Sequence, residues 1–153
     1  MNTTYVYGIA PGPIPGIVAL HLKNQLVDRV DVVQCSASIA AGVFWSLLGW
    51  AHQDDDVFVQ VENSVVGQRA DTASLHHEYA SAAALHVGSR WVWSEMNAET
   101  VEPWATDARL EAAGLLGRTA GMRHARAAAR QALFCAVHDA GLRDPASKNS
   151  APG

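Results

Sequence analysis

Charged side chains are scarce in this chain of 153 residues, and long apolar runs are missing. Only 17% of the residues are charged and 49% are hydrophobic, a balance typical of a folded globular domain and not of a disordered segment. No apolar run reaches the ~18 residues that a membrane-spanning helix needs. The opening residues also lack the basic and apolar regions of a signal peptide. We therefore expect one cytoplasmic domain with a sizeable core and no membrane partner.

Cysteine is nearly absent as well. Cys35 and Cys135 lie far apart in the chain and do not have the spacing of a metal site. This pattern is typical of two reduced thiols in a cytosolic protein.

Acidic residues are missing from the segment between Glu111 and Asp139. Four of the nine arginines fall in that segment: Arg118, Arg123, Arg126 and Arg130. The net charge of −4 argues weakly against a nucleic-acid partner. The local cluster argues for one, because an arginine-rich face can contact phosphates. A solvated helix face explains the cluster equally well.

Five short runs rich in β-branched and aromatic residues predict strands. They cover residues 5–9, 16–22, 26–33, 57–61 and 90–94. Short links join the first three, which favours an antiparallel meander. The fourth is nearly all apolar, as expected of a strand covered on both faces. The fifth places Trp91 and Trp93 on one face, and core packing is the simplest role for these two tryptophans and for Trp45 and Trp50.

Apolar residues at helical spacing predict the helices. The expected ranges are about 36–52 with Ser36 or Ser38 as the cap, 71–87 with Gly88 as the stop, 104–113 begun by Pro103, and 124–140. A glycine-bounded loop, 114–121, precedes the last helix. Residues 143–153 are rich in Pro, Ser, Ala and Gly and are expected to form a disordered tail. The domain therefore spans residues 1–142.

The order of the elements indicates an α/β domain. Three strands, a helix, a strand, a helix, a strand and two helices match the ribonuclease H-like fold, a five-stranded mixed sheet flanked by helices. In that arrangement the fourth strand lies parallel beside the first. Ala10 and Glu62 then stand at the carboxyl ends of neighbouring strands, where open α/β sheets place their sites.

Three segments, taken in order, resemble a known family. Residues 8–12 read Gly-Ile-Ala-Pro-Gly, where the family has Gly-Ile-Asp-Pro-Gly. An apolar strand ends in Glu62, where the family also has glutamate. His124 and Ala127 open an alanine-rich stretch, where the family has Asp or His, two residues, and then Asp. Over residues 5–140 the chain resembles the RuvC-type Holliday junction resolvases, in a bacteriophage-like variant.

The resemblance implies a structure-selective endonuclease that cuts four-way junctions and other branched DNA. Two divalent cations, Mg²⁺ or Mn²⁺, activate the attacking water and stabilise the leaving oxygen in such enzymes. Hard cations of this kind take carboxylate oxygens. The resemblance assigns position 10 to bridging both metals and Glu62 to one of them. The other goes to positions 124 and 127, which share a helix face at i, i+3 spacing.

The chain departs from this pattern at two positions, because Ala10 and Ala127 have no ligand atoms. A core alanine is a reasonable explanation for Ala127 in an alanine-rich helix, but less so for Ala10. We interpret the pair as an engineered replacement of two aspartates that leaves an inactive nuclease still able to hold its substrate. A natural non-catalytic relative is the alternative. In both cases we expect negligible metal binding and cleavage by this chain.

The role of His124 has two explanations. It can serve as a metal ligand or general base, which suits Mn²⁺ somewhat better than an all-oxygen site. It can instead be a helix-start histidine bonded to nearby backbone.

The expected partners are branched DNA and a second copy of the chain. Residues 63–69 contain no aromatic, whereas several family members have one there that wedges into the junction; flaps and forks are therefore plausible substrates too. Arg69, Arg118 and Arg123 are the best candidates for phosphate contacts, which position the backbone and read no sequence. The family implies a homodimer, since a two-fold enzyme matches a two-fold junction. The helix 71–87 could supply the partner face or simply pack in the core.

Two other functions remain open on this evidence. The chain could be a branched-DNA-binding protein that evolved without the catalytic acids. It could also serve an unrelated role such as RNA processing, because one fold hosts many activities.

Overall fold

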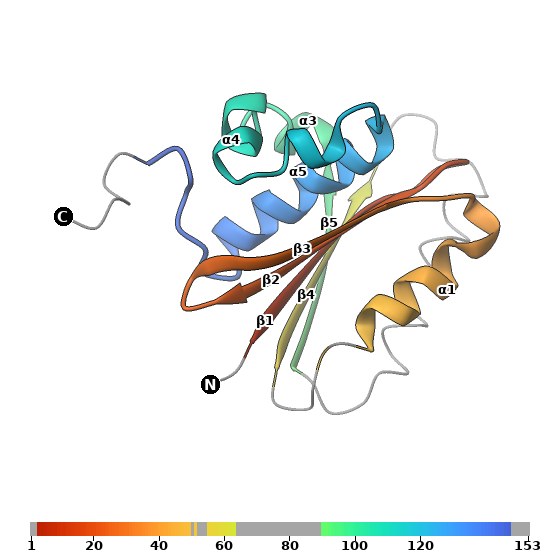
Figure 1. Ribbon diagram of the computed structural model, residues 1–153, viewed down its shortest axis with the longest axis horizontal. Coiled ribbons are helices and arrows are strands. Elements are labelled where there is room, and N and C mark those ends of the chain that lie inside the picture. The colour runs from red at the N-terminus through yellow and green to blue at the C-terminus, as the bar shows by residue number, and fades with distance from the viewer. Residues whose placement is uncertain (1–2, 50, 52–54, 64–89, 148–153) are drawn as a thin grey trace.

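Five strands form one mixed sheet at the centre of the computed structural model, which describes residues 3–49, 51, 55–63 and 90–147. The strands are β1 (Thr4–Ala10), β2 (Gly16–Lys23), β3 (Leu26–Gln34), β4 (Asp56–Asn63) and β5 (Arg90–Asn97). Their order across the sheet is β3-β2-β1-β4-β5 (Figure 1). The first three pair antiparallel, whereas β4 runs parallel to both β1 and β5. The predicted fold class and the predicted meander are confirmed.

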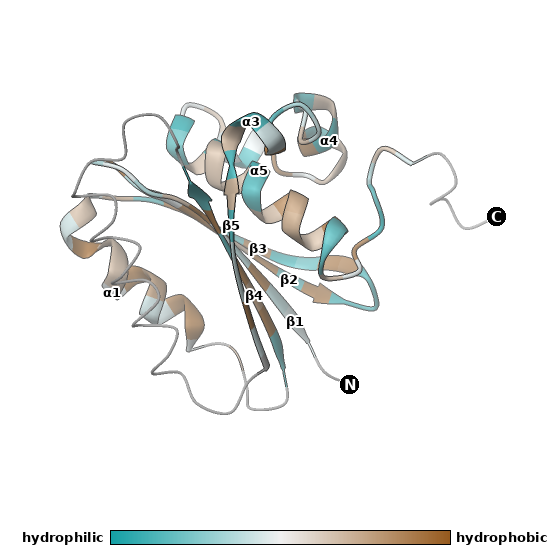
Figure 2. Cartoon of the chain, turned by 180° about the vertical axis from the view of Figure 1, so that it is seen from behind, coloured by the Kyte–Doolittle hydropathy of each residue, from teal (hydrophilic) through white to brown (hydrophobic). Residues whose placement is uncertain are grey.

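Helices cover both faces of this sheet. Helix α1 (Ala37–Leu48) lies on one side, and three short elements and one long helix lie on the other (Figure 1). The latter are α3 (Ala98–Val101), α4 (Asp107–Ala112), η1 (Gly117–Thr119) and α5 (Arg123–His138). Seen from behind, α1 and α5 again lie on opposite sides, and hydrophobic and hydrophilic residues alternate along α5 (Figure 2). Each helical layer thus buries its apolar side against one face of the strands.

Alternation along the strands divides the core into two clusters. Tyr7 and Ile9 of β1 pack with Phe44 of α1 on one face. Val6 and Ala10 of the same strand pack against α4 and α5 on the other. Successive side chains point to opposite faces of a strand, so both faces of β1 are buried.

The α5 backbone lies unusually close to β1 and β2. A Cβ atom added to Gly8 would sit 2.1 Å from the carbonyl oxygen of Ala128, and one added to Gly16 would sit 2.2 Å from that of His124. These distances are too short for any side chain. Alanines on the facing side of α5, including Ala128 and Ala132, keep the helix surface flat there. The sequence of β1 and β2 therefore determines where the beginning of α5 lies.

Two predictions about local structure were wrong. The helix expected over 104–113 begins later, as α4, because the Thr106 side chain accepts a hydrogen bond from the Arg109 amide at 3.2 Å and caps the helix there. Pro103 lies before this cap, and the short helix α3 precedes both. Trp45 was expected in the core, yet it is 45% exposed, since it faces away from the sheet on α1.

The first residues of the expected tail contact the domain. The carboxylate of Asp144 pairs with the Arg109 guanidinium, whose Nε lies 3.1 Å from Oδ1, and this contact ties residues 143–147 to α4. Residues 148–153, Trp50 and the predicted helix 71–87 lie outside the described residues.

Two smaller expectations have clear outcomes. Ser36 occupies the N-cap position of α1, but its hydroxyl lies 3.1 Å from that of Ser38 and makes no capping bond. Cys35 and Cys135 are free thiols, as expected. Among the described residues, no helix has the length and apolar character needed to cross a membrane.

The contact between α5 and β1 predicts the effect of one substitution. Gly8→Ala should lower the free energy of unfolding by about 3 kcal/mol, because its methyl group would collide with the α5 backbone. Urea unfolding measures the change. Gly42→Ala on α1 is the matched control: its added Cβ meets nothing within 4 Å, so it should stabilise the protein by up to about 1 kcal/mol. Similar effects of both substitutions would contradict the proposed close packing.

Candidate functional site

Ala10 and Glu62 lie together at one edge of the sheet. The parallel register of β1 and β4 pairs Ile9 with Val61, so Ala10 and Glu62 each follow directly after that pair. Both positions face α5. Ala10 belongs to the cluster formed with that helix and is only 2% exposed. Gln60, two residues before Glu62 on the same face, hydrogen-bonds to α5.

His124 and Ala127 occupy the first turns of α5, above the same edge. Gly16, whose added Cβ would touch the His124 carbonyl, is the antiparallel partner of Ala10. Ala127 stands one helical turn before Gln131. Both His124 and Ala127 are partly exposed. The four predicted positions therefore converge, although they come from three separate elements.

A distant glutamine holds the beginning of α5. The side-chain oxygen of Gln34, at the end of β3, accepts hydrogen bonds from the amides of His124 at 3.0 Å and Ala125 at 3.1 Å. Met122, at the N-cap position, makes no side-chain capping bond. Gln34 thus satisfies two of the amides that a helix start leaves unpaired. Sequence reasoning missed it, because capping residues usually directly precede their helix.

A pair of buried glutamines also fixes α5 against β4. Nε2 of Gln60 donates to Oε1 of Gln131 at 2.7 Å, and both side chains are buried. Nε2 of Gln131 donates in turn to the Met96 carbonyl at 3.3 Å, and Met96 is the register partner of Glu62. Because buried amides are costly unless bonded, this network favours one position of α5. The glutamines in the sequence carried no signal of this contact.

Glu62 has an unusual electrostatic environment. Burial raises the pKa of its carboxyl group above the ordinary value, and the negative charges of Glu102 and Glu99 raise it further. A partly buried carboxylate beside other acids gains from a nearby cation, and perturbed groups of this kind are common at functional sites.

The ring of His124 forms no hydrogen bond with any residue in the described part of the chain, so the backbone-bonded alternative is not observed there. Because Ala10 and Ala127 have no ligand atoms, Glu62 and His124 are the two of the four positions whose side chains can bind a metal. Within the described residues no three His, Cys, Asp or Glu side chains are grouped to hold a metal ion. A two-metal centre needs a bridging carboxylate, and Ala10 cannot supply one. The residues present do not fit such a centre.

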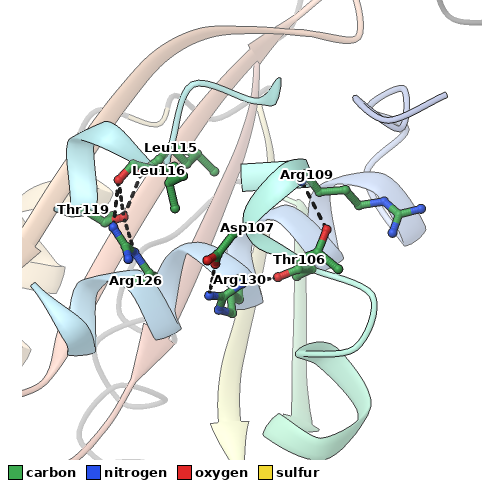
Figure 3. Close-up of polar contacts among 9 residues, drawn as sticks. Thr106, Asp107, Arg109, Leu115, Leu116, Thr119, Arg126 and Arg130 are labelled. Carbon is green, nitrogen blue, oxygen red and sulfur yellow. Dashed lines mark hydrogen bonds and ion pairs between the residues drawn. The ribbon is translucent and has the colours of Figure 1, made fainter. Parts of the chain in front are cut away.

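Two of the clustered arginines serve internal contacts (Figure 3). Nε of Arg126 donates to Oγ1 of Thr119 at 3.2 Å, and Nη2 donates to the carbonyl of Leu116 at 3.0 Å. Arg130 pairs with Asp107 at 2.6 Å. This hydrogen bond and the charge of Arg130 hold the pKa of Asp107 below its usual range. A purely solvated arginine face is therefore excluded for Arg126 and Arg130.

The three arginines predicted to contact phosphate lie in different surroundings. Arg118 is exposed but donates to the carbonyl of Val30 at 2.8 Å. Arg123 is exposed, adjoins His124 and forms no hydrogen bond or ion pair within the described part of the chain. Arg69 lies outside the described residues. Arg123 is thus the most available cation beside the four converging positions.

Comparison with known proteins identifies the fold. No family model and no curated protein sequence matches the chain. Among solved structures, the chain is similar to T. thermophilus RuvC in complex with a Holliday junction substrate, with a TM-score of 0.55 and 20% sequence identity. The match covers 87% of this chain and 92% of that one. The chain therefore has a RuvC-like, ribonuclease H-like fold, as its element order predicts.

The raised pKa of Glu62 predicts how stability depends on pH. Above the ordinary glutamate pKa of about 4.3, Glu62 is ionised in the unfolded chain, whereas burial disfavours its charge in the folded chain. The free-energy cost that this group adds to folding therefore grows with pH until the raised folded-state pKa is passed. Glu62→Gln removes the charge, so its stability relative to the unsubstituted chain should rise as the pH increases from 4 to 8. Urea unfolding across this range measures the difference. A difference that stays constant with pH would contradict the assigned environment.

Proposed function

We propose that this chain is a silenced form of a metal-dependent endonuclease that cuts Holliday junctions and other branched DNA. The observation that carries the proposal is the convergence of Ala10, Glu62, His124 and Ala127 at one edge of the sheet, facing one helix. The family resemblance assigns metal ligands to these four positions. The fold adds support, since the solved structure of T. thermophilus RuvC contains a Holliday junction substrate.

Two aspartates would complete the site. With aspartate at positions 10 and 127, three carboxylates and one imidazole would converge, a donor set suited to two Mg²⁺ or Mn²⁺ ions. Those ions would supply an activated water and stabilisation of the leaving oxygen. Glu62 would bind the ions through a carboxylate whose negative charge is disfavoured by burial and by neighbouring acids.

The proposed partners follow from symmetry and charge. A homodimer would match the two-fold symmetry of a four-way junction and allow two paired cuts. Arg118 and Arg123 lie on the exposed surface around the beginning of α5, where their charges can position a DNA backbone without reading its sequence. Arg69 follows Glu62 closely in the sequence and would serve in the same way. Because residues 63–69 contain no aromatic, flaps and forks are proposed as substrates beside junctions. A bacterial or bacteriophage-infected cell is the proposed setting.

A second candidate is a branched-DNA-binding protein without catalysis. Its support comes from Ala10, which is almost fully buried in an apolar cluster with α5. A long-silent protein would have repacked around this methyl group and would gain little from an added carboxylate.

Restoring the two aspartates separates these functions. A synthetic four-way junction is incubated with Mg²⁺ or Mn²⁺ and either this chain or its Ala10→Asp, Ala127→Asp variant. This chain should shift the junction on a gel without cutting it, and the restored variant should cut it. The matched control carries asparagine at both positions, which has the same shape without the charge, and should remain inactive.

Each other result favours a different conclusion. If every variant binds the junction and none cuts, the non-catalytic binder becomes the better account. Cleavage of RNA hairpins in preference to branched DNA would instead support RNA processing. If no variant binds, the resemblance extends to the fold and not to the function.

A further inference from the structure

A cavity of about 440 Å³ opens beside Ala127 and extends along α5. Side chains around it include Glu102, Thr119, Met122, Arg123, Arg126 and Arg130. Its volume falls within the range of pockets that hold small molecules, roughly 300–1,000 Å³. It is therefore larger than a bare phosphate ion requires.

The cavity is predominantly positive. Arg123, Arg126 and Arg130 follow one another at i, i+3 and i+7 on α5, so they share a helix face. Arg130 pairs with Asp107, but Arg126 donates to neutral oxygens of Thr119 and Leu116 (Figure 3). Among the described residues Arg126 forms no direct ion pair, although its charge helps to lower the pKa of the Asp107 carboxyl group. Three guanidinium groups outnumber the carboxylates of Asp107 and Glu102, so the surplus positive charge favours an anion in the cavity.

The arginines divide into a fixed pair and a free one. Contacts with η1 hold Arg126, and Asp107 together with the carbonyl of Ala105 holds Arg130. These side chains have already lost their rotational freedom, so an anion that binds there avoids that entropic cost. Arg123 has no such partner among the described residues, so its side chain remains able to close on a ligand.

The helix start itself does not supply the anion site. The amides of His124 and Ala125, which would otherwise face an anion, are both bonded to Gln34. Recognition therefore rests mainly on the guanidinium groups, whose paired N–H donors suit phosphate oxygens.

We propose that this cavity binds one nucleotide of the DNA strand, next to the phosphate that is cut. Arg123 closes on the nucleotide's phosphate group against the fixed guanidinium of Arg126, and the remaining volume takes the sugar or base. The position of the nucleotide along a cleaved strand rests on the proposed function, whereas binding of a nucleotide phosphate in this cavity does not. Glu102 contributes one negative charge to the same cavity and opposes phosphate binding.

The test is a titration of this chain with deoxyadenosine monophosphate, followed by NMR of the backbone amides. Shifts should concentrate at Gly121, Met122, Arg123 and Ala127. Arg123→Gln should weaken binding about tenfold, as expected for the loss of one charged phosphate contact. Glu102→Gln should tighten binding by about threefold, a gain that damage to the fold would not produce.

Lys23→Gln is the matched control. Lys23 is also a cation with a mostly exposed side chain, at 61%, but it stands at the end of β2 and pairs loosely with Asp28 at 3.9 Å. Its substitution should leave the dissociation constant unchanged. An equal loss in Lys23→Gln and Arg123→Gln would reduce the effect to overall charge and overturn the proposal.

Two further ligands complete the test. Deoxyadenosine lacks the phosphate, and inorganic phosphate lacks the nucleoside; both should bind more weakly than the monophosphate. Equal binding of deoxyadenosine would rule out the arginine contact, and equal binding of inorganic phosphate would rule out a nucleotide site.

Junction cleavage by the Ala10→Asp, Ala127→Asp variant is measured independently of nucleotide binding. Cleavage without nucleotide binding overturns only the cavity proposal, whereas nucleotide binding without cleavage supports the cavity and contradicts the nuclease.

Discussion

The direct contact between the α5 backbone and strands β1 and β2 is the constraint on which the site depends. Only the lack of side chains at Gly8 and Gly16 allows the carbonyls of Ala128 and His124 to approach so closely. This contact places the beginning of α5 over the carboxyl end of β1. Because β1 and β4 run in parallel register, the same contact also places α5 above Glu62. The lack of a side chain at two glycines therefore determines whether residues from three elements meet.

Polar groups then give this contact its specificity. An alanine-rich helix on an apolar sheet could slide or rotate, since small apolar surfaces fit together in several ways. The buried bond between Gln60 and Gln131 and the cap from Gln34 oppose such movement, because any other position would leave buried amides unpaired. The same low-dielectric surroundings disfavour the charge of Glu62. The fixed position of α5 and the raised pKa of Glu62 thus both result from burial in low-dielectric surroundings.

Elements encoded by neighbouring residues formed where the sequence predicts them, whereas contacts between distant residues left no such pattern. Strands were predicted well, because each is a short β-prone run and their links are too short to permit many topologies. Errors arose where one local signal competed with another, as when Thr106 and not Pro103 began α4. The sequence was equally consistent with a solvent-exposed position for Arg126 and Arg130. Their partners Thr119 and Asp107 lie 7 and 23 residues away in η1 and α4, so the periodicity of α5 does not indicate them.

The sequence by itself determined the class of fold and the order of the strands, because hydrophobic alternation and short turn motifs are encoded by neighbouring residues. Only the tertiary structure decided which side chains meet. The cap of α5 by Gln34, the glutamine pair beneath it, and the division of the arginines into fixed and free groups all join residues distant in sequence. Such contacts depend on the packing of a whole helix against a sheet, and no local pattern records them.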